Sequence, residues 1–68
     1  MITRNYKDYQ IVIYKIESNL GKGYRAAYSI PKSNGLRENV RSVESYRPGV
    51  KARDMLEGVK ALIDSHLF

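Results

Sequence analysis

The sequence predicts a single small α+β domain, in which one C-terminal helix covers a three-stranded antiparallel sheet. Three segments rich in β-branched and aromatic residues are separated by turn residues, and a last segment changes to helical spacing. The predicted elements are strands at about 9–17, 23–30 and 38–46 and a helix at about 50–66. An antiparallel meander has one apolar face to bury, and the helix is the only available cover, so the expected order is βββα.

The first two strands are marked by their side chains and by the glycines between them. Residues 1–8 are polar with isolated apolar positions and are expected to lead into the first strand. The second strand alternates cleanly, which predicts that it is half-buried. Its helix-facing side should hold Tyr24, Ala26, Tyr28 and Ile30, and its open side Arg25, Ala27 and Ser29.

The third strand follows Pro31 and the Asn34-Gly35 pair, which is favoured in hairpin turns. It is poorer in apolar residues than the other two. Strict alternation places Val40 and Val43 on opposite faces. The segment is therefore expected to be an edge strand or to contain a bulge.

The helix is predicted from apolar residues at three- and four-residue spacing. Gly58 lies inside it, at a cost of ~1 kcal/mol relative to Ala, and suggests that the helix approaches the sheet closely. No Ser, Thr, Asp or Asn caps the start, so residues 48–51 form a weak N-terminus. The apolar stripe consists of Ala52, Met55, Leu56, Val59, Leu62 and Ile63, followed by His66 and Leu67.

The chain length and composition predict one domain, spanning residues 1–68, with a thin core. The sequence contains no Cys, so disulfides cannot stabilise it, and self-association as a homodimer becomes a reasonable expectation. It also shows no apolar run long enough for a signal or membrane segment. These features predict a cytoplasmic protein without a membrane contact.

The positive charge is unevenly distributed. The net charge is +5, with +7 on residues 1–53 and −2 on residues 54–68. A surface that meets phosphates shows such asymmetry, and so do many domains whose charge serves only solubility. Both interpretations remain open.

Catalytic, metal and cofactor sites are not predicted. His66 is the only imidazole, and it lies near the end of the chain, where a packing or surface role is the simpler interpretation. Without Cys or a second His, no thiolate or multi-imidazole metal site can form. The glycines flanking Lys22 precede a strand rather than a helix, and therefore predict a hairpin instead of a phosphate-binding loop.

Tyr residues next to Lys or Arg suggest a nucleic-acid interface. Aromatic rings on a sheet can stack on unpaired bases while neighbouring cations hold phosphates. The predicted contacts lie on the open face of the sheet, with Arg25 and Arg41 at the centre and Lys15 and Lys22 nearby. The alternative is that the tyrosines belong to the core, as the alternation indicates for Tyr24 and Tyr28.

The order of elements from Tyr9 to His66 resembles that of HicB-like antitoxin domains, which have a partial RNase H-like fold. The shared features are a second strand opened by Gly23-Tyr24-Arg25-Ala26 and a helix that follows Gly49. The family's usual Thr cap and Glu-Ala pair are replaced here, and its DNA-binding appendage is missing. The resemblance implies a protein that binds and blocks a small RNA-cleaving toxin.

Two further resemblances are similarly general. The segment from Tyr24 through a polar turn, a strand and a helix resembles arm-type DNA-binding domains of tyrosine integrases, which implies DNA binding by the sheet. In the third strand, Glu44 stands in place of that family's basic residues. The chain also resembles short bacterial proteins that begin with a Tyr-rich strand and end on a helix carrying Ile63-Asp64, which implies no function.

Together these observations predict a non-catalytic binding or accessory module that acts through contact with a protein partner or with a second copy. An exposed edge strand or the open sheet face would supply the contact. The alternative is a domain that binds DNA or RNA through the basic open face. An enzyme is not expected.

Overall fold

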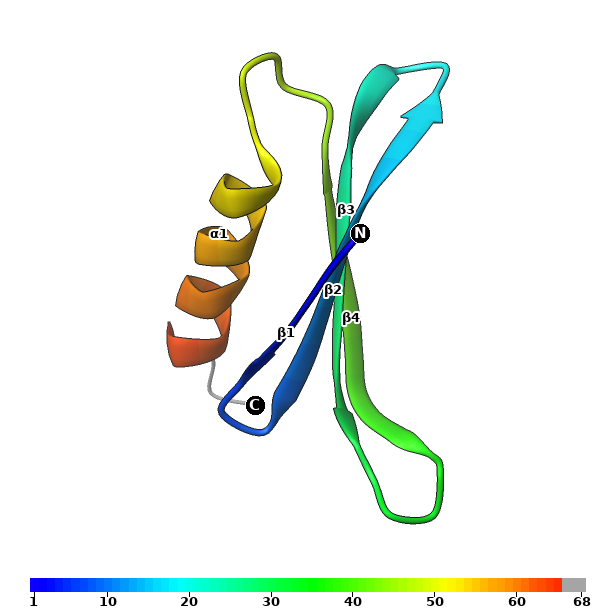
Figure 1. Ribbon diagram of the computed structural model, residues 1–68, viewed down its shortest axis with the longest axis vertical. Coiled ribbons are helices and arrows are strands. Elements are labelled where there is room, and N and C mark those ends of the chain that lie inside the picture. Colours follow the sequence, from blue (N-terminus) through cyan, green and yellow to red (C-terminus); the bar gives the residue numbers. More distant parts are fainter. Residues whose placement is uncertain (66–68) are drawn as a thin grey trace.

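The computed structural model describes residues 1–65 and shows a four-stranded antiparallel sheet with one helix packed on one face (Figure 1). The α+β class and the meander are confirmed, and the sheet has one strand more than predicted. The strands are adjacent in the order β1-β2-β3-β4. The elements are β1 (Ile2–Tyr6), β2 (Tyr9–Ser18), β3 (Gly21–Pro31), β4 (Arg37–Ser45) and α1 (Ala52–Ser65).

The additional strand, β1, is formed by residues that the sequence suggested were only a polar lead-in. It pairs with β2 through a two-residue turn, Lys7-Asp8, in which Lys7 has a φ of +54°. This backbone region is unusual for a residue other than Gly, Asn or Asp. The turn therefore carries no glycine signal, and the hairpin is recognisable only once the fold is known.

The strand β4 is both an edge strand and bulged, and this confirms the two features expected of it. Between the pairs Tyr28↔Arg41 and Ile30↔Glu38, β3 has one residue while β4 has two. Asn39, one of these two, has a φ of +52°. Its amide donates a hydrogen bond to the Tyr9 hydroxyl at 3.3 Å, which holds the bulge against the core.

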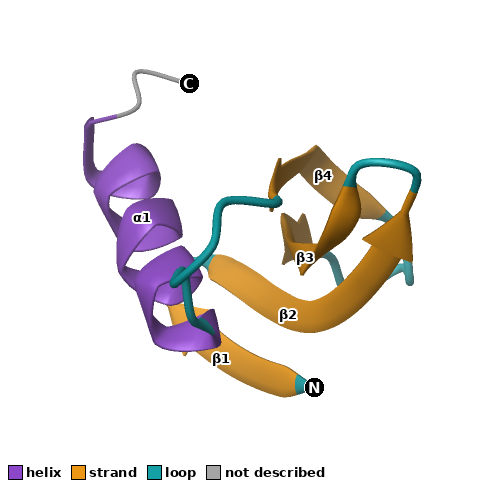
Figure 2. Ribbon diagram, turned by 90° about the horizontal axis from the view of Figure 1, so that it is seen from above, coloured by secondary structure: helices purple, strands orange, loops and turns teal. Residues whose placement is uncertain are grey.

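The core lies between α1 and the two central strands, β2 and β3, with β4 farther from the helix (Figure 2). Ile11, Ile13 and Val59 are fully buried, and each contributes about 1.5–3 kcal/mol through burial of its side chain. The predicted helix-facing side of β3 is confirmed. The buried hydrophobic residues are Tyr9, Ile11, Ile13, Ala26, Tyr28, Met55, Val59 and Ile63.

The predicted helix is confirmed, although its boundaries and its apolar stripe differ in detail. It begins at Ala52, two residues later than expected, and Leu62 is 40% exposed while Ile63 is buried. The predicted positions His66 and Leu67 lie outside the described residues. The start is also better capped than the sequence suggested, because the Lys51 backbone N–H donates to the Asp54 carboxylate at 2.8 Å. This contact is one half of a capping box.

A polar clasp fastens the β1–β2 turn to the C-terminal end of α1. Asp64 accepts a hydrogen bond from the Tyr6 hydroxyl at 2.7 Å and forms an ion pair with Lys7. The Lys60 amine lies 5.5 Å from the centre of the Tyr6 ring. The contact with Lys7, followed by that with Tyr6, lowers the pKa of the Asp64 carboxyl, and the contact with Asp64 raises the pKa of Lys7.

Two glycines inside regular elements have different roles. A Cβ atom at Gly23 would lie 2.0 Å from the carbonyl oxygen of Ser45, so the position accepts no side chain unless the backbone moves. A Cβ atom at Gly58 would meet nothing within 4 Å. The expectation that Gly58 permits a close approach of helix and sheet is therefore wrong. The close approach occurs at Gly23, between β3 and the end of β4.

The same substitution at these two glycines should have opposite effects. Gly23→Ala should lower the free energy of unfolding by about 1–3 kcal/mol, as overpacking typically does. Gly58→Ala should raise it by up to about 1 kcal/mol, because Ala favours the helix. Urea unfolding followed by circular dichroism measures both. A neutral effect at Gly23 would contradict the close approach of Ser45.

The clasp should make stability depend on pH. Because the pKa of Asp64 is lower in the folded chain than its ordinary value of 3.8, its contribution is present above that value and is lost as the pH falls through the folded pKa. Asp64→Asn should therefore have a lower Tm than the wild type at about pH 6, and the gap should shrink towards about pH 3. Glu17→Gln, which removes an equal charge at the far end of β2, is the control. A Tm difference between Asp64→Asn and the wild type that does not change with pH would contradict an ionised Asp64 in the clasp.

Candidate anion-binding groove

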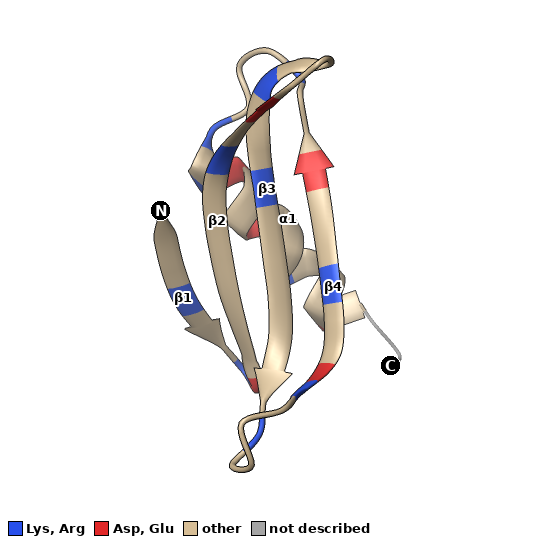
Figure 3. Ribbon diagram, turned by 90° about the vertical axis from the view of Figure 1, so that its right-hand side faces the viewer, with Lys and Arg blue, Asp and Glu red and all other residues tan. Residues whose placement is uncertain are grey.

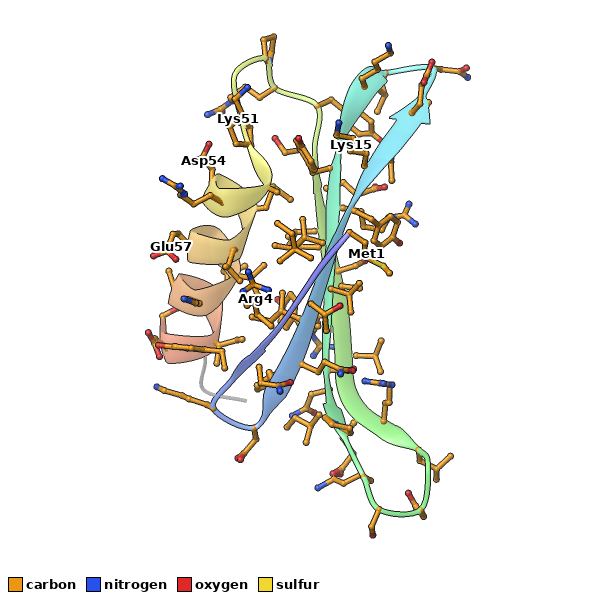
Figure 4. The ribbon with its side chains drawn as sticks, viewed as in Figure 1. Met1, Arg4, Lys15, Lys51, Asp54 and Glu57 are labelled. Atoms are coloured by element: carbon orange, nitrogen blue, oxygen red, sulfur yellow. The ribbon has the colours of Figure 1, made fainter. Side chains whose placement is uncertain are left out.

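A groove opens at one end of the molecule, between the β2–β3 hairpin and the loop that joins β4 to α1. Its volume is about 490 Å³. Figure 4 shows Lys15 at this end of the sheet, on the side where the loop passes, with Lys51 at the nearby start of the helix. The lining residues are Lys15, Ile16, Glu17, Lys22, Gly23, Tyr24, Arg47, Pro48, Gly49 and Val50.

The groove exists because the helix is shorter than the strands that it covers. The ten and eleven residues of β2 and β3 span about 33–36 Å, whereas the 14 residues of α1 span about 21 Å. The helix ends near the β1–β2 turn, where the clasp holds it. The opposite end of the same sheet face is therefore left for the loop to cover in part.

One wall of the groove is the uncovered end of the sheet. Lys15 pairs with Tyr24 and Glu17 pairs with Lys22 across the two strands. Side chains of paired residues share a face. Because Tyr24 packs against the core on the helix side, these side chains lie on the helix-facing side of the sheet.

The other wall is the loop after β4. The absence of a side chain at Gly23 lets the end of β4 approach β3, which brings the loop against the sheet. A turn then reverses the chain, with the Val50 N–H donating to the Arg47 carbonyl at 3.4 Å and Gly49 at a φ of +86°. Arg47 consequently lines the same groove as the two lysines.

The charges in the groove are not compensated. Lys15, Lys22 and Arg47 oppose a single carboxylate, Glu17, which leaves a net charge of +2. None of these four takes part in an ion pair with residues 1–65. By contrast, four other cations each have a carboxylate within 4 Å, namely Lys7, Arg25, Lys32 and Lys60.

The four residues predicted to bind nucleic acid are not brought together. Arg25 lies on the open face, where it donates to Glu44 at 2.9 Å and to the Tyr14 hydroxyl at 3.4 Å. The contacts with Tyr14 and Glu44 raise its pKa. Arg41 is opposite Tyr28 and thus on the helix-facing side, so the expectation that the two arginines share the open face is wrong.

Lys15 and Lys22 do lie together, although on the face opposite to that of Arg25. For Lys22, this face could have been predicted from the sequence, because Lys22 and Tyr24 are two residues apart on one strand and alternation puts them on the same side. Arg47 was not predicted as a site residue. Its position depends on the path of the loop after β4. The Arg-Pro-Gly sequence indicates a turn there and does not indicate in which direction the chain continues. A role for any of these residues in nucleic-acid binding stays a prediction.

The open face of the sheet differs from the groove in that its central charges are paired. Figure 3 looks onto this face, with the helix behind it, and within residues 1–65 no element covers it. The side chains of Val12, Ile16 and Ala27 are half-buried there. Its central charges, Arg25 and Glu44, neutralise each other. The centre of this face therefore carries no excess charge.

On each edge strand, one backbone carbonyl accepts a hydrogen bond from a side chain of the same strand. Arg4 donates to the Thr3 carbonyl in β1 at 2.9 Å, and Arg41 donates to the Val40 carbonyl in β4 at 3.3 Å. The bulge at Asn39 further distorts β4. Such features disfavour the addition of a strand from another chain.

Within residues 1–65, no group of three or more His, Asp or Glu side chains could hold a metal ion. The one helix described is too short and too polar to cross a membrane. His66 lies outside the described residues.

Comparison with protein-family models, curated proteins and solved structures finds no match. The resemblances to HicB-like domains and to integrase arm-type domains therefore stay predictions.

Proposed function

We propose that this protein is a non-catalytic binding module that holds an acidic segment of a partner protein in the groove. The observation that carries the proposal is the set of three cations, Lys15, Lys22 and Arg47, that line one groove and have no carboxylate partner within residues 1–65. A groove with an excess of one sign of charge attracts and steers a ligand of the opposite sign.

A protein segment suits this end of the molecule better than a nucleic-acid strand. Glu17 inside the groove would repel a continuous row of phosphates. Leu20, at the tip of the adjacent β2–β3 turn, is 74% exposed and offers an apolar contact beside the cations. Protein interfaces combine an apolar contact with a polar rim in this way. A protein-binding role is also what the resemblance to HicB-like domains implies.

A second copy of this chain is a poorer partner. Each copy carries a net charge of +5, so two basic ends would repel one another. The engaged carbonyls of Thr3 and Val40 oppose pairing through β1 or β4. These features argue for a different protein, with an acidic surface.

The polar groups of the groove are suited to binding rather than to catalysis. General acid-base catalysis needs side chains that are held in position by their neighbours. Within the described part of the chain, no hydrogen bond joins the charged side chains of the groove to one another. Cations of this kind can adjust to the position of an acidic ligand.

The proposal is tested by backbone amide NMR titration with a short oligoglutamate peptide, with single-stranded oligothymidine as the competing ligand. Oligoglutamate should shift the amides of residues 15–24 and 47–50 and should bind more weakly as salt is added. Lys22→Gln combined with Arg47→Gln should weaken binding by about tenfold or more, since this change removes two of the three cations.

The matched control is Lys32→Gln combined with Arg37→Gln, which removes one Lys and one Arg near the β3–β4 turn. Its affinity should stay close to that of the wild type. An equal loss in both variants would show that only net charge matters and would overturn the groove as the site. Tighter binding of oligothymidine than of oligoglutamate at physiological salt would favour the nucleic-acid alternative instead.

A further inference from the structure

We propose that the groove recognises a phosphate monoester carried by the partner, so that the acidic segment is a phosphorylated one. This inference rests on the proposed function and specifies the group that is bound. It follows from the amount of charge in the groove, from the number of donors and from the two directions from which they come.

The amount of charge fits one dianion. The three cations and Glu17 leave a net charge of +2 in the groove. A phosphorylated Ser or Thr carries about −1.5 to −2 at neutral pH, whereas a single carboxylate carries −1. One phosphate monoester therefore neutralises the groove, and one carboxylate leaves half of the charge unmatched.

The donors also exceed what a carboxylate can use. The two lysines and the arginine that line the groove together carry eleven side-chain N–H donors. A carboxylate has two oxygens with about four acceptor sites, and a bidentate guanidinium uses about two of them, which leaves few for both amines. A phosphate monoester has three strong acceptor oxygens, so it can accept from the guanidinium and from both amines together.

The donors stand on two opposing walls. Lys15 and Lys22 come from the sheet, and Arg47 comes from the loop after β4. A tetrahedral phosphate can present oxygens to both walls, which a planar carboxylate does less well. Glu17 then limits the site to a single such group, because a second anion would meet its carboxylate.

The test compares three peptides of one sequence that carry Ser, Glu or phosphoserine at the central position, titrated by NMR at about pH 7.5. The phosphoserine peptide should bind at least about tenfold more tightly than the Glu peptide. Its affinity should fall between about pH 7.5 and pH 5, because the phosphate takes up a proton near pH 6. The Glu peptide, which stays ionised over this range, should show no such loss.

Two further measurements show which residue and which part of the ligand account for the preference for phosphoserine. Arg47→Gln should remove most of the preference for phosphoserine over Glu, and Arg37→Gln, outside the groove, should leave that preference unchanged. Free O-phosphoserine should shift the amides of the same groove residues as the peptide, more weakly, if the monoester itself is recognised. No shift with free O-phosphoserine would overturn recognition of the monoester.

The outcomes also distinguish this inference from the function on which it rests. Equal affinities for the phosphoserine and Glu peptides would overturn the inference and leave an acidic-segment module. Binding of the phosphoserine peptide without any binding of oligoglutamate would support the inference and would restrict the proposed function to phosphorylated segments. Failure of every acidic peptide to bind would overturn both.

Discussion

The packing of a single 14-residue helix on strands of ten and eleven residues is the constraint on which the rest of this structure depends. The helix must cover the apolar centre of the sheet, where Ile11, Ile13 and Val59 meet, and it cannot also reach the far end of β2 and β3. The clasp at Asp64 lies at the end that the helix covers. The opposite end remains accessible, and the uncompensated cations are found there.

Those parts of the fold that follow from side-chain periodicity could be predicted. Alternation in β3 placed Ala26 and Tyr28 in the core, and the weak apolar pattern of β4 indicated an edge strand with a bulge. The strand β1 could not be predicted, because Lys7 adopts a positive φ without any glycine signal and contacts a residue 57 positions away. A local pattern does not contain such long-range information.

The candidate site was predictable only in part, for a related reason. Lys15 and Lys22 were identified by their charge, yet they were assigned to the face that Arg25 occupies, whereas their pairing with Glu17 and Tyr24 places them opposite. The position of Arg47 follows from a loop path that depends on the close approach at Gly23. Charge can be counted from a sequence, but whether a cation is already paired depends on the packing around it.

The clasp has a consequence for how the chain folds. It joins the turn after the first strand to the last turn of the helix, so it closes a loop of nearly the entire chain. Closing such a loop is entropically costly until intervening elements have brought its ends together. All four strands pair with a neighbour in the sequence, whereas the contact between the β1–β2 turn and Asp64 forms only after α1 has docked. The contacts of Asp64 with Tyr6 and Lys7 are therefore among the last to form, and they fix the β1–β2 turn to the helix late in folding.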